Sequence, residues 1–373
     1  MKDYVIATFS DIHLGHRRNP AISTIECLDQ LIFGDQLLER IDMLIFAGDV
    51  FDRLLDLDYP YLDDIDHWIA RVLMGCARHG VSFRLLKGTH SHDQSQPERF
   101  VTLASILDLK GLDFKYFDKL DVERHEASGA DILYVPDNLS HDSSETLANV
   151  RTLLASRGID KVDIAVMHGM FDYQQPEGIV IDECHNSLAY KELVRTVIFI
   201  GHVHNHSRNG IIVAQGSTDR LCHGEEEPKG FVIAEITNGY ADIYFIENKG
   251  ARIYKTVKVY HMDLVETLAC LEKFVEPLPG TACIRVEAEP SHPIFTNMEE
   301  LKTLYPTLTW SKLPKDDSDT EVKEVVFSDT ELQTWVPVSI NKTNIVDILL
   351  NRLSNKLNEQ ELASMKEELQ ELI

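Results

Sequence analysis

Aspartate and histidine residues gather at several places in this sequence of 373 residues, each time just after a run of apolar residues. The densest place is Gly201–His206, where three imidazoles follow the apolar run 197–200. Neutral imidazole is the commonest metal ligand in proteins. On a continued strand His202 and His204 would share one face, whereas a loop leaving the strand would aim them at two points. The stretch favours a metal site over a polar loop with chance histidines.

Four further apolar runs end in candidate ligands. These are Asp11 and His13 after residues 5–9, Asp49 after 43–47, His90 and His92 after 81–86, and His168 after 163–167. In layered α/β folds, functional sites form at the carboxyl ends of strands. Five strand ends that all carry Asp or His therefore predict one shared metal site.

The number and type of these side chains favour two ions. The six candidate ligands are Asp11, His13, Asp49, His168, His202 and His204. They exceed what one tetrahedral ion uses, and a carboxylate such as Asp49 can bridge two ions ~3.5–4 Å apart. Asp/His ligation without cysteine suits Mn, Fe or Zn. Such a pair hydrolyses phosphoesters, because both ions bind phosphate oxygens and generate hydroxide from water, while a nearby His protonates the leaving oxygen.

Strands and helices that alternate along the chain must position these residues. Strand-type runs alternate with amphipathic stretches near 20–32, 59–76, 97–109 and 142–157, and consecutive strands continue to about residue 246. This order predicts a layered α/β domain with mixed sheets over residues 1–250. A smaller region of strands and a helix is expected at 255–337. Residues 343–373 have the pattern of two amphipathic helices, which would dock on this second region or on a partner.

Composition narrows the class of protein. Lys and Arg number 36 against 61 Asp and Glu, a formal charge of −25, which argues against a free-standing, non-specific nucleic-acid binder. It does not argue against an enzyme that concentrates metal cations or borrows a partner's basic surface. The six cysteines form no C-x-x-C pair, as expected for reduced thiols in the cytosol. We see neither a signal peptide nor a membrane span, so a cytoplasmic protein is expected.

These motifs, in this order and spacing, resemble those of the calcineurin-like metallophosphoesterases. The matching segments are Asp11-x-His13, Gly48-Asp49-x-x-Asp52, residues 88–93, His168, and Gly201-His202-x-His204. More narrowly, residues 11–15, 48–52, 216–217, 225–226 and 229–231 are similar to the SbcD-type DNA repair nucleases, of bacteria or phage. The resemblance covers about the first 235 residues by motif, and the remainder by layout only.

The resemblance implies a calcineurin-like sandwich, in which mixed sheets are flanked by helices, with an α+β capping domain at 255–337. It implies a manganese-dependent hydrolase with exonuclease and single-strand endonuclease activity in DNA repair and recombination. Mg²⁺, Fe²⁺ or Zn²⁺ are alternative metals. It further implies a homodimer whose helical tail binds an SbcC-type coiled-coil ATPase. By position, Asp11, His13 and His204 would bind one metal, His168 and His202 the other, and Asp49 would bridge them. In a phage-encoded protein the compartment would be the host cytoplasm.

The third motif departs from the family pattern G-N-H-[DE], in which Asn binds the second metal and His is the general acid. Here the segment is Gly88-Thr89-His90-Ser91-His92-Asp93. Alignment from the glycine pairs Thr89 with His90, whereas alignment from the end pairs Ser91 with His92. We favour the second, because His92-Asp93 preserves the His-acid pair, so His92 is the expected general acid.

Two other functions fit the same residues. A small-molecule or nucleotide phosphodiesterase would use the same metal site, and the acidic surface favours it. A non-catalytic scaffold is the other alternative, and the altered third motif favours it. Arg17, Arg18 and Arg53 follow ligand loops and would touch DNA phosphates or be solvated. His206, the Cys184-His185 pair and the Cys222-His223 pair have no expected role in the site.

Overall fold

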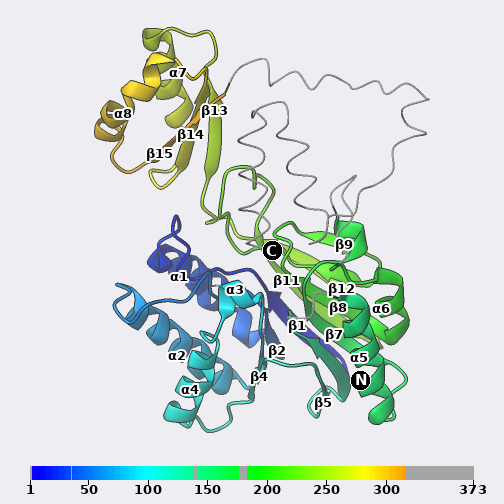
Figure 1. Ribbon diagram of the computed structural model, residues 1–373. Coiled ribbons are helices and arrows are strands. Elements are labelled where there is room, and N and C mark those ends of the chain that lie inside the picture. Colours follow the sequence, from blue (N-terminus) through cyan, green and yellow to red (C-terminus); the bar gives the residue numbers. More distant parts are fainter. Residues whose placement is uncertain (1, 35, 138–141, 176–182, 316–373) are drawn as a thin grey trace, which may run out of the picture.

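The computed structural model describes residues 2–34, 36–137, 142–175 and 183–315 (Figure 1). The expected helical tail at 343–373, and residues 316–337 of the expected capping region, lie outside this part of the chain. The described chain forms two large mixed sheets with helices beside them, and a third, smaller sheet that stands apart from them (Figure 1).

The first sheet has the strand order β12-β11-β1-β2-β3-β4. Its strands are β1 Tyr4–Phe9, β2 Met43–Ala47, β3 Ser82–Leu86, β4 Phe114–Phe117, β11 Gly230–Thr237 and β12 Tyr240–Glu247. Strands β1 to β4 are parallel, whereas β11 runs antiparallel to β1 and to β12. Strands β1, β2 and β3 are buried over almost their whole length, as expected for a sheet that is covered on both faces.

The second sheet has the order β5-β6-β7-β8-β10-β9. Its strands are β5 Asp121–His125, β6 Ala130–Val135, β7 Val162–His168, β8 Val194–Gly201, β9 Ser207–Asn209 and β10 Ile212–Ala214. Strands β6, β7, β8 and β10 are parallel, and antiparallel β5 and β9 form the two edges. The expectation of mixed sheets is confirmed for both.

The helices beside these sheets follow the amphipathic pattern of the sequence. They are α1 Ala21–Asp29, α2 Leu62–His79, α3 His90–Asp93, α4 Glu98–Leu107, α5 Ser143–Ser156 and α6 Ser187–Leu193, with η1 Gln30–Gly34, η2 Leu37–Glu39 and η3 Asp172–Gln174. Helix α2 buries one stripe that includes Ile65, Trp68 and Val72. It begins with two acidic residues in its first turn, where they favour the positive end of the helix dipole, and ends at Gly80 with φ 69°.

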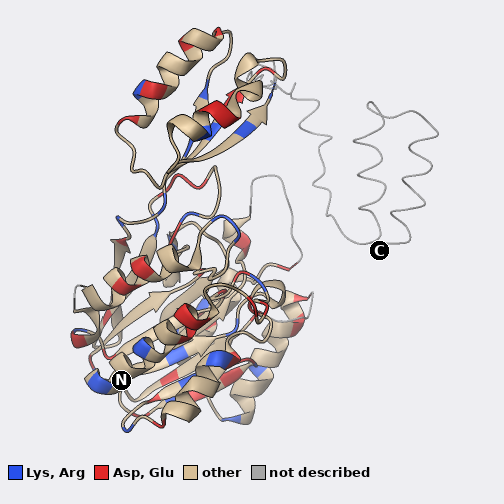
Figure 2. Ribbon diagram, turned by 90° about the vertical axis from the view of Figure 1, so that its left-hand side faces the viewer, with Lys and Arg blue, Asp and Glu red and all other residues tan. Residues whose placement is uncertain are grey.

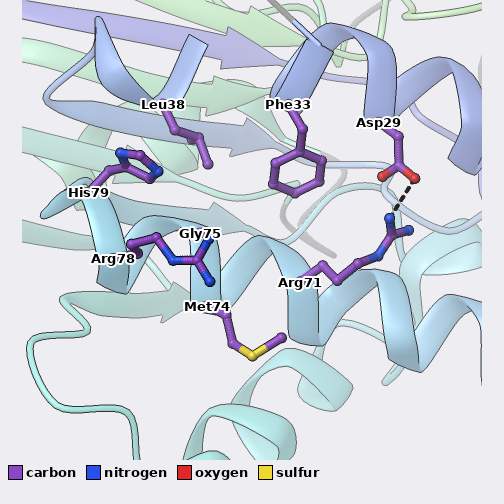
Figure 3. Close-up of a pocket in the computed structure, with 8 residues that line it drawn as sticks. All are labelled: Asp29, Phe33, Leu38, Arg71, Met74, Gly75, Arg78 and His79. Atoms are coloured by element: carbon purple, nitrogen blue, oxygen red, sulfur yellow. Dashed lines mark hydrogen bonds and ion pairs between the residues drawn. The ribbon is translucent and has the colours of Figure 1, made fainter. Parts of the chain in front are cut away.

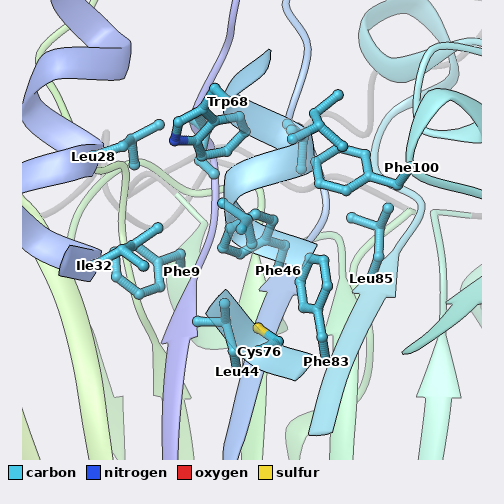
Figure 4. Packing of buried hydrophobic residues seen from close by; sticks show 14 of the residues in the cluster. Phe9, Leu28, Ile32, Leu44, Phe46, Trp68, Cys76, Phe83, Leu85 and Phe100 are labelled. Carbon is cyan, nitrogen blue, oxygen red and sulfur yellow. The ribbon is translucent and has the colours of Figure 1, made fainter. Parts of the chain in front are cut away.

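Three apolar cores define the layers. Between the sheets lie residues from both, among them Ile45 of β2 and Phe199 of β8. On the outer face of the first sheet, Phe46 packs against Trp68 of α2 and Phe100 of α4 (Figure 4). A third core covers the outer face of the second sheet with residues of α5 and α6. The order helices, sheet, sheet, helices is a layered α/β sandwich.

The third sheet is parallel, with the order β13-β14-β15. Its elements are β13 Tyr254–Lys258, α7 Leu264–Val275, β14 Cys283–Ala288, η4 Pro293–Thr296, α8 Met298–Leu304 and β15 Thr309–Pro314. It has its own apolar core. Asp263 starts α7 by accepting a hydrogen bond from the amide of Glu266, whose carboxylate in turn accepts from the Asp263 amide. The expected strands and helix of this region are confirmed, and α8 and β15 were not foreseen.

Candidate metal centre

The ends of five parallel strands from the two sheets meet at one place. Strands β1, β2 and β3 of the first sheet lead into Asp11, Asp49 and Thr89, and β7 and β8 of the second lead into His168 and His202. The sheets are joined there directly: His168 Nδ1 donates to Ala47 O at 2.7 Å, and the His202 amide donates to the Asp11 carboxylate at 3.0 Å. Residues that are far apart in sequence therefore share one site.

Asp11, His13 and His204 form the first group, in which one ligand atom of each lies within 4.8 Å of the others. Asp11 is fully buried and His13 is 2% exposed. Neither ring nitrogen of His13 has a hydrogen-bond partner among the described residues, although Nδ1 lies 3.3 Å from Asp52 Oδ1. A buried imidazole without hydrogen bonds is costly unless another group satisfies it, and a bound cation would do so.

Asp49, His168 and His202 form the second group, again with ligand atoms within 4.8 Å of one another. Because His168 Nδ1 is used by the Ala47 carbonyl, Nε2 faces Asp49 Oδ2 at 3.3 Å. This arrangement is typical of metal-binding histidines, which donate through one nitrogen and bind through the other. Asp49 and His168 are both buried, whereas His202 is exposed, so an ion bound here would be open to solvent on the His202 side.

Asp49 lies next to both groups. Its Oδ2 is 4.0 Å from His13 Nε2 and 3.3 Å from His168 Nε2. Its backbone amide donates to Asp93 Oδ2 at 3.2 Å, which fixes the loop after β2. A carboxylate in this position is placed to contact ions in either group, as a bridging ligand does.

The backbone is strained at four of the six candidate ligands. Asp11, His13 and Asp49 have φ of 52°, 53° and 50°, and His202 has φ 102°. These values lie in the left-handed region that residues with a side chain avoid, at a cost of about 1–3 kcal/mol each. Strain of this kind persists where the surrounding structure holds it, and it concentrates at functional sites.

Gly48 is required by the close contact between the two sheets. It has φ +91°, and a Cβ at this position would lie 2.2 Å from His168 Nδ1 and 2.7 Å from the Cα of Gly88. Both neighbours are themselves held in place. The glycine before Asp49 therefore allows the second sheet to bring His168 up to the carboxylate.

Glu225 and Lys229 support His204 from outside the first group. His204 Nδ1 donates to Glu225 Oε1 at 3.0 Å, and Glu225 Oε2 lies 3.2 Å from Lys229 Nζ. The ammonium group is buried and also donates to the His204 carbonyl at 2.9 Å. Glu225 thus fixes the ring so that Nε2 points to the site. The resemblance marked both residues, but their contact with His204 was not foreseen.

The third motif combines the two alignments considered from the sequence. Thr89, not Ser91, joins the second group: its hydroxyl donates to Asp49 Oδ2 at 3.1 Å and lies 3.3 Å from His168 Nε2. Ser91 is exposed on α3, so the preference for it as the hydroxyl ligand is wrong. The extra residues His90 and Ser91 lie in this short helix.

His92 and Asp93 take the positions expected from the end of that motif. His92 Nδ1 donates to the Asp52 carbonyl at 2.7 Å, and its ring packs edge-on against His13 at 4.9 Å. Asp93 is buried and accepts hydrogen bonds from the amides of Gly88, Asp49 and Phe51. Asp93 therefore shapes both loops, while the His92 ring lies beside the first group.

The charged groups of the site shift one another's pKa. Burial lowers the pKa of His168, but the charge and hydrogen bond of Asp49 outweigh it and raise the pKa to about 10. In turn, burial raises the pKa of Asp49, but the charge of His168 and its hydrogen bond lower it by more. The pKa of Asp49 therefore lies well below its usual range. Burial and the charge of His168 lower the pKa of His202, whereas Glu225 and Asp11 raise that of His204 against burial. The second group thus holds one charged pair and one neutral imidazole.

The donor set fits divalent metal ions. Two of the imidazoles are oriented by a hydrogen bond at the far nitrogen, and neither nitrogen of His13 makes a hydrogen bond within the described residues, although both lie near carboxylates. Oxygen and imidazole donors without thiolate suit Mn, Fe or Zn. The structure therefore contains a candidate site for one or two metal ions, built from the six residues that the sequence singled out, and His13, Asp52 and His92 form a third group that overlaps the first.

Three histidines without an expected metal role have structural contacts. His206 donates to the Ala214 carbonyl at 2.8 Å and stacks on Phe245 at 4.5 Å. His185 is buried against Phe171 and Tyr190, and burial lowers its pKa to about 4. His223 packs edge-on against Tyr254. Each is explained by packing, in agreement with the sequence interpretation.

The arginines near the ligand loops differ from one another. Arg53 is half-buried and its Nε donates to the Gly15 carbonyl at 3.1 Å, so it holds the loop after His13. Arg17 and Arg18 are exposed on that same loop. In the view of Figure 2, acidic and basic residues are intermixed along the helices of both parts of the molecule.

A separate pocket of about 370 Å³ lies in the helical layer between η1 and α2 (Figure 3). Phe33, Leu38 and Met74 form its apolar wall, and Arg71 is paired with Asp29 at its rim. None of the six candidate ligands lines it, so it is distinct from the metal centre. In the described part of the chain, no helix is both long and apolar enough to span a membrane.

Comparison with known proteins identifies no family. No family model matches the sequence, and no curated protein matches it. Similar solved structures include TT1561 of Thermus thermophilus, with 10% identity and a TM-score of 0.38 over 65% of this chain and 99% of that one. Another is GAP50, the anchor in the inner membrane complex of Plasmodium, with 14% identity and a TM-score of 0.38 over 67% and 86%. Likenesses at such TM-scores carry no conclusion about this chain.

Proposed function

We propose that the protein is a metal-dependent phosphodiesterase of the calcineurin-like type, and more narrowly a DNA exonuclease and endonuclease similar to the SbcD-type nucleases. The observation that carries the proposal is the pair of Asp/His groups on either side of Asp49. A pair of divalent ions so held would bind phosphate oxygens and lower the pKa of a water molecule.

The protein residues then have distinct tasks. Asp11, His13 and His204 would hold the first ion and His168 and His202 the second, and Asp49 lies next to both groups. Glu225 and the Ala47 carbonyl fix the rings of His204 and His168. Because these partners occupy Nδ1, Nε2 is the binding atom in each ring.

His92 is the proposed general acid. Its Nδ1 is held by the Asp52 carbonyl, which leaves Nε2 as the atom that exchanges a proton with the leaving oxygen. Its ring packs against His13, so it stands beside the first group. The protonated imidazole would donate the proton at Nε2, a role that typically contributes about 10²–10⁴-fold to the rate.

DNA is the proposed substrate, with a homodimer and an SbcC-type ATPase as partners. Because the chain carries a net charge of −25, tight DNA binding would depend on the metals and on these partners. The same charge favours the alternative, a phosphodiesterase that acts on small or nucleotide diesters. A comparison of Mn²⁺-dependent turnover on duplex DNA ends and on bis-p-nitrophenyl phosphate separates the two.

Two uncharged variants test the site assignment. Asp49→Asn is expected to abolish Mn²⁺-dependent cleavage, and His92→Gln to lower it by about 10²-fold or more without weakening Mn²⁺ binding. Asp160→Asn and His67→Gln, both outside the metal centre, are the matched controls. If Asp49→Asn cleaves as fast as the wild type, the assignment is wrong. If the wild type hydrolyses no phosphodiester with any divalent metal, the protein is a scaffold.

A further inference from the structure

One segment of the chain, residues 217–229, holds His204 of the first metal group at both its backbone and its ring. The amide of Ser217 donates to the His204 carbonyl at 3.0 Å. Glu225 Oε1 accepts from the His204 ring at 3.0 Å, and Glu225 Oε2 accepts from the amide of Leu221 at 3.1 Å. The position of this candidate ligand therefore depends on a segment that contains none of the six candidate ligands.

The same segment also holds the beginning of the third sheet. Asp219 is buried, and its Oδ1 accepts a hydrogen bond at 2.6 Å from the amide of Arg252, which lies just before β13. The hydroxyl of Ser217 donates to the carbonyl of Asp219 at 2.8 Å. The chain passes from the sandwich to the third sheet at this point (Figure 1). Ser217 is thus bonded both to His204 and to the residue that holds the start of that sheet.

Asn19 links a second ligand loop, the one that follows His13, to the same place. Its Nδ2 donates to Asp219 Oδ2 at 3.3 Å, and its Oδ1 accepts from the hydroxyl of Tyr254, the first residue of β13, at 2.8 Å. Asn19 and Tyr254 are each 2% exposed. Buried polar groups are costly to leave without partners, so a movement of β13 has to break these hydrogen bonds or carry the two loops with it.

We infer that Asp219, Asn19 and Tyr254 are positioning residues, which couple the orientation of the third sheet to the affinity of the first metal group. A displacement of β13 acts on Asp219, and segment 217–229 transmits it to the backbone and ring of His204. Such coupling is reciprocal, so an ion in the first group also restrains the third sheet. A partner or substrate that moves the third sheet would therefore change the affinity for this ion. The inference rests on the proposed function only in that the first group holds an ion.

Mn²⁺ affinity of the full chain, measured by isothermal titration calorimetry for one ion at a time, tests the inference without reference to activity. His202→Gln leaves the first group to be measured, and His204→Gln leaves the second. Tyr254→Phe is expected to lower the affinity by about three- to tenfold in the His202→Gln chain, the range of one hydrogen bond, and not at all in the His204→Gln chain. Tyr260→Phe, whose lost hydroxyl is bonded to Glu287 at 2.8 Å, is the matched control and is expected to change neither affinity.

Hydrogen–deuterium exchange supplies the reciprocal measurement. Mn²⁺ bound to the His202→Gln chain is expected to slow amide exchange in peptides that cover residues 252–258, and Tyr254→Phe is expected to remove most of this protection. Tyr254→Phe and Asn19→Ala are expected to be non-additive in both measurements, because each breaks the same hydrogen bond.

Two results would overturn the inference. An equal loss of affinity at both ions in Tyr254→Phe would mean a general destabilisation. A lower melting temperature with unchanged affinity for the first ion would make the three residues a structural anchor only. If the His202→Gln chain binds no ion but the wild type does, the two binding steps of the wild type with and without Tyr254→Phe give the same comparison. If the wild type binds no ion, the proposed function itself fails, which is a different result.

Discussion

Metal binding is expected to release a proton from His168. In the metal-free protein the ring is paired with Asp49 at 3.3 Å, and this pairing outweighs burial and raises its pKa to about 10. A metal ligand must be the neutral imidazole, so the second group has to lose this proton before an ion binds. At pH 7, removal of a proton from a group with this pKa costs about 4 kcal/mol.

The direction of the pH dependence follows. Below the pKa of His168 the proton competes with the metal, so the apparent affinity for the second ion falls about tenfold for each pH unit from about pH 9 down to about pH 7. Above about pH 10 it levels off. His204, whose pKa is also raised by Glu225 and Asp11 against burial, adds a smaller dependence at the first ion. His202, whose pKa is lowered, adds none.

Mn²⁺ titration calorimetry in two buffers of different ionisation enthalpy measures the protons released. At about pH 8 we expect about one proton per second-group ion in the wild type and in His202→Gln, if that variant still binds, and none from this group in His168→Gln. Equal heats in the two buffers, or an affinity that does not change over that pH range, would refute the assignment of a charged His168–Asp49 pair.

Three further predictions test other contacts. Glu225→Gln keeps the shape of the side chain but loses the charge beside His204. It is expected to lower the affinity for the first ion by about 10–100-fold in a Mn²⁺ titration, and an unchanged affinity would contradict the role of Glu225. Gly48→Ala places a Cβ 2.2 Å from His168 Nδ1, so we expect a lower melting temperature and loss of the second ion, whereas Gly158→Ala, with open space around the Cβ, should keep both ions. The stability of the metal-free protein should fall as pH rises from about 7 through about 10, because the raised pKa of His168 stabilises the folded state only while the ring is protonated; urea unfolding of His168→Gln should lack this fall.

The residues of the candidate metal centre were predictable because parallel strands buried on both faces are visible as apolar runs. Asp11, Asp49 and His168 each lie at the end of such a run, and parallel strands bring their carboxyl ends together whatever their order in the sheet. The grouping into two sheets, and the pairing of β1 with β11, depend on long-range contacts that no local pattern contains.

The third motif shows where sequence reasoning reached its limit. An alignment of residues 88–93 with the family pattern matches either the beginning or the end of the segment. In the structure, Thr89 and His92 both lie at the site, and the extra residues His90 and Ser91 are part of a short helix between them.

Anomalous scattering from a crystal of the full chain grown with Mn²⁺ tests the two-metal account most directly. We expect two peaks ~3.5–4 Å apart, one among Asp11, His13 and His204 and the other among Asp49, His168 and His202, with the Asp49 carboxylate between them. A single peak, or peaks away from these side chains, would contradict the central claim.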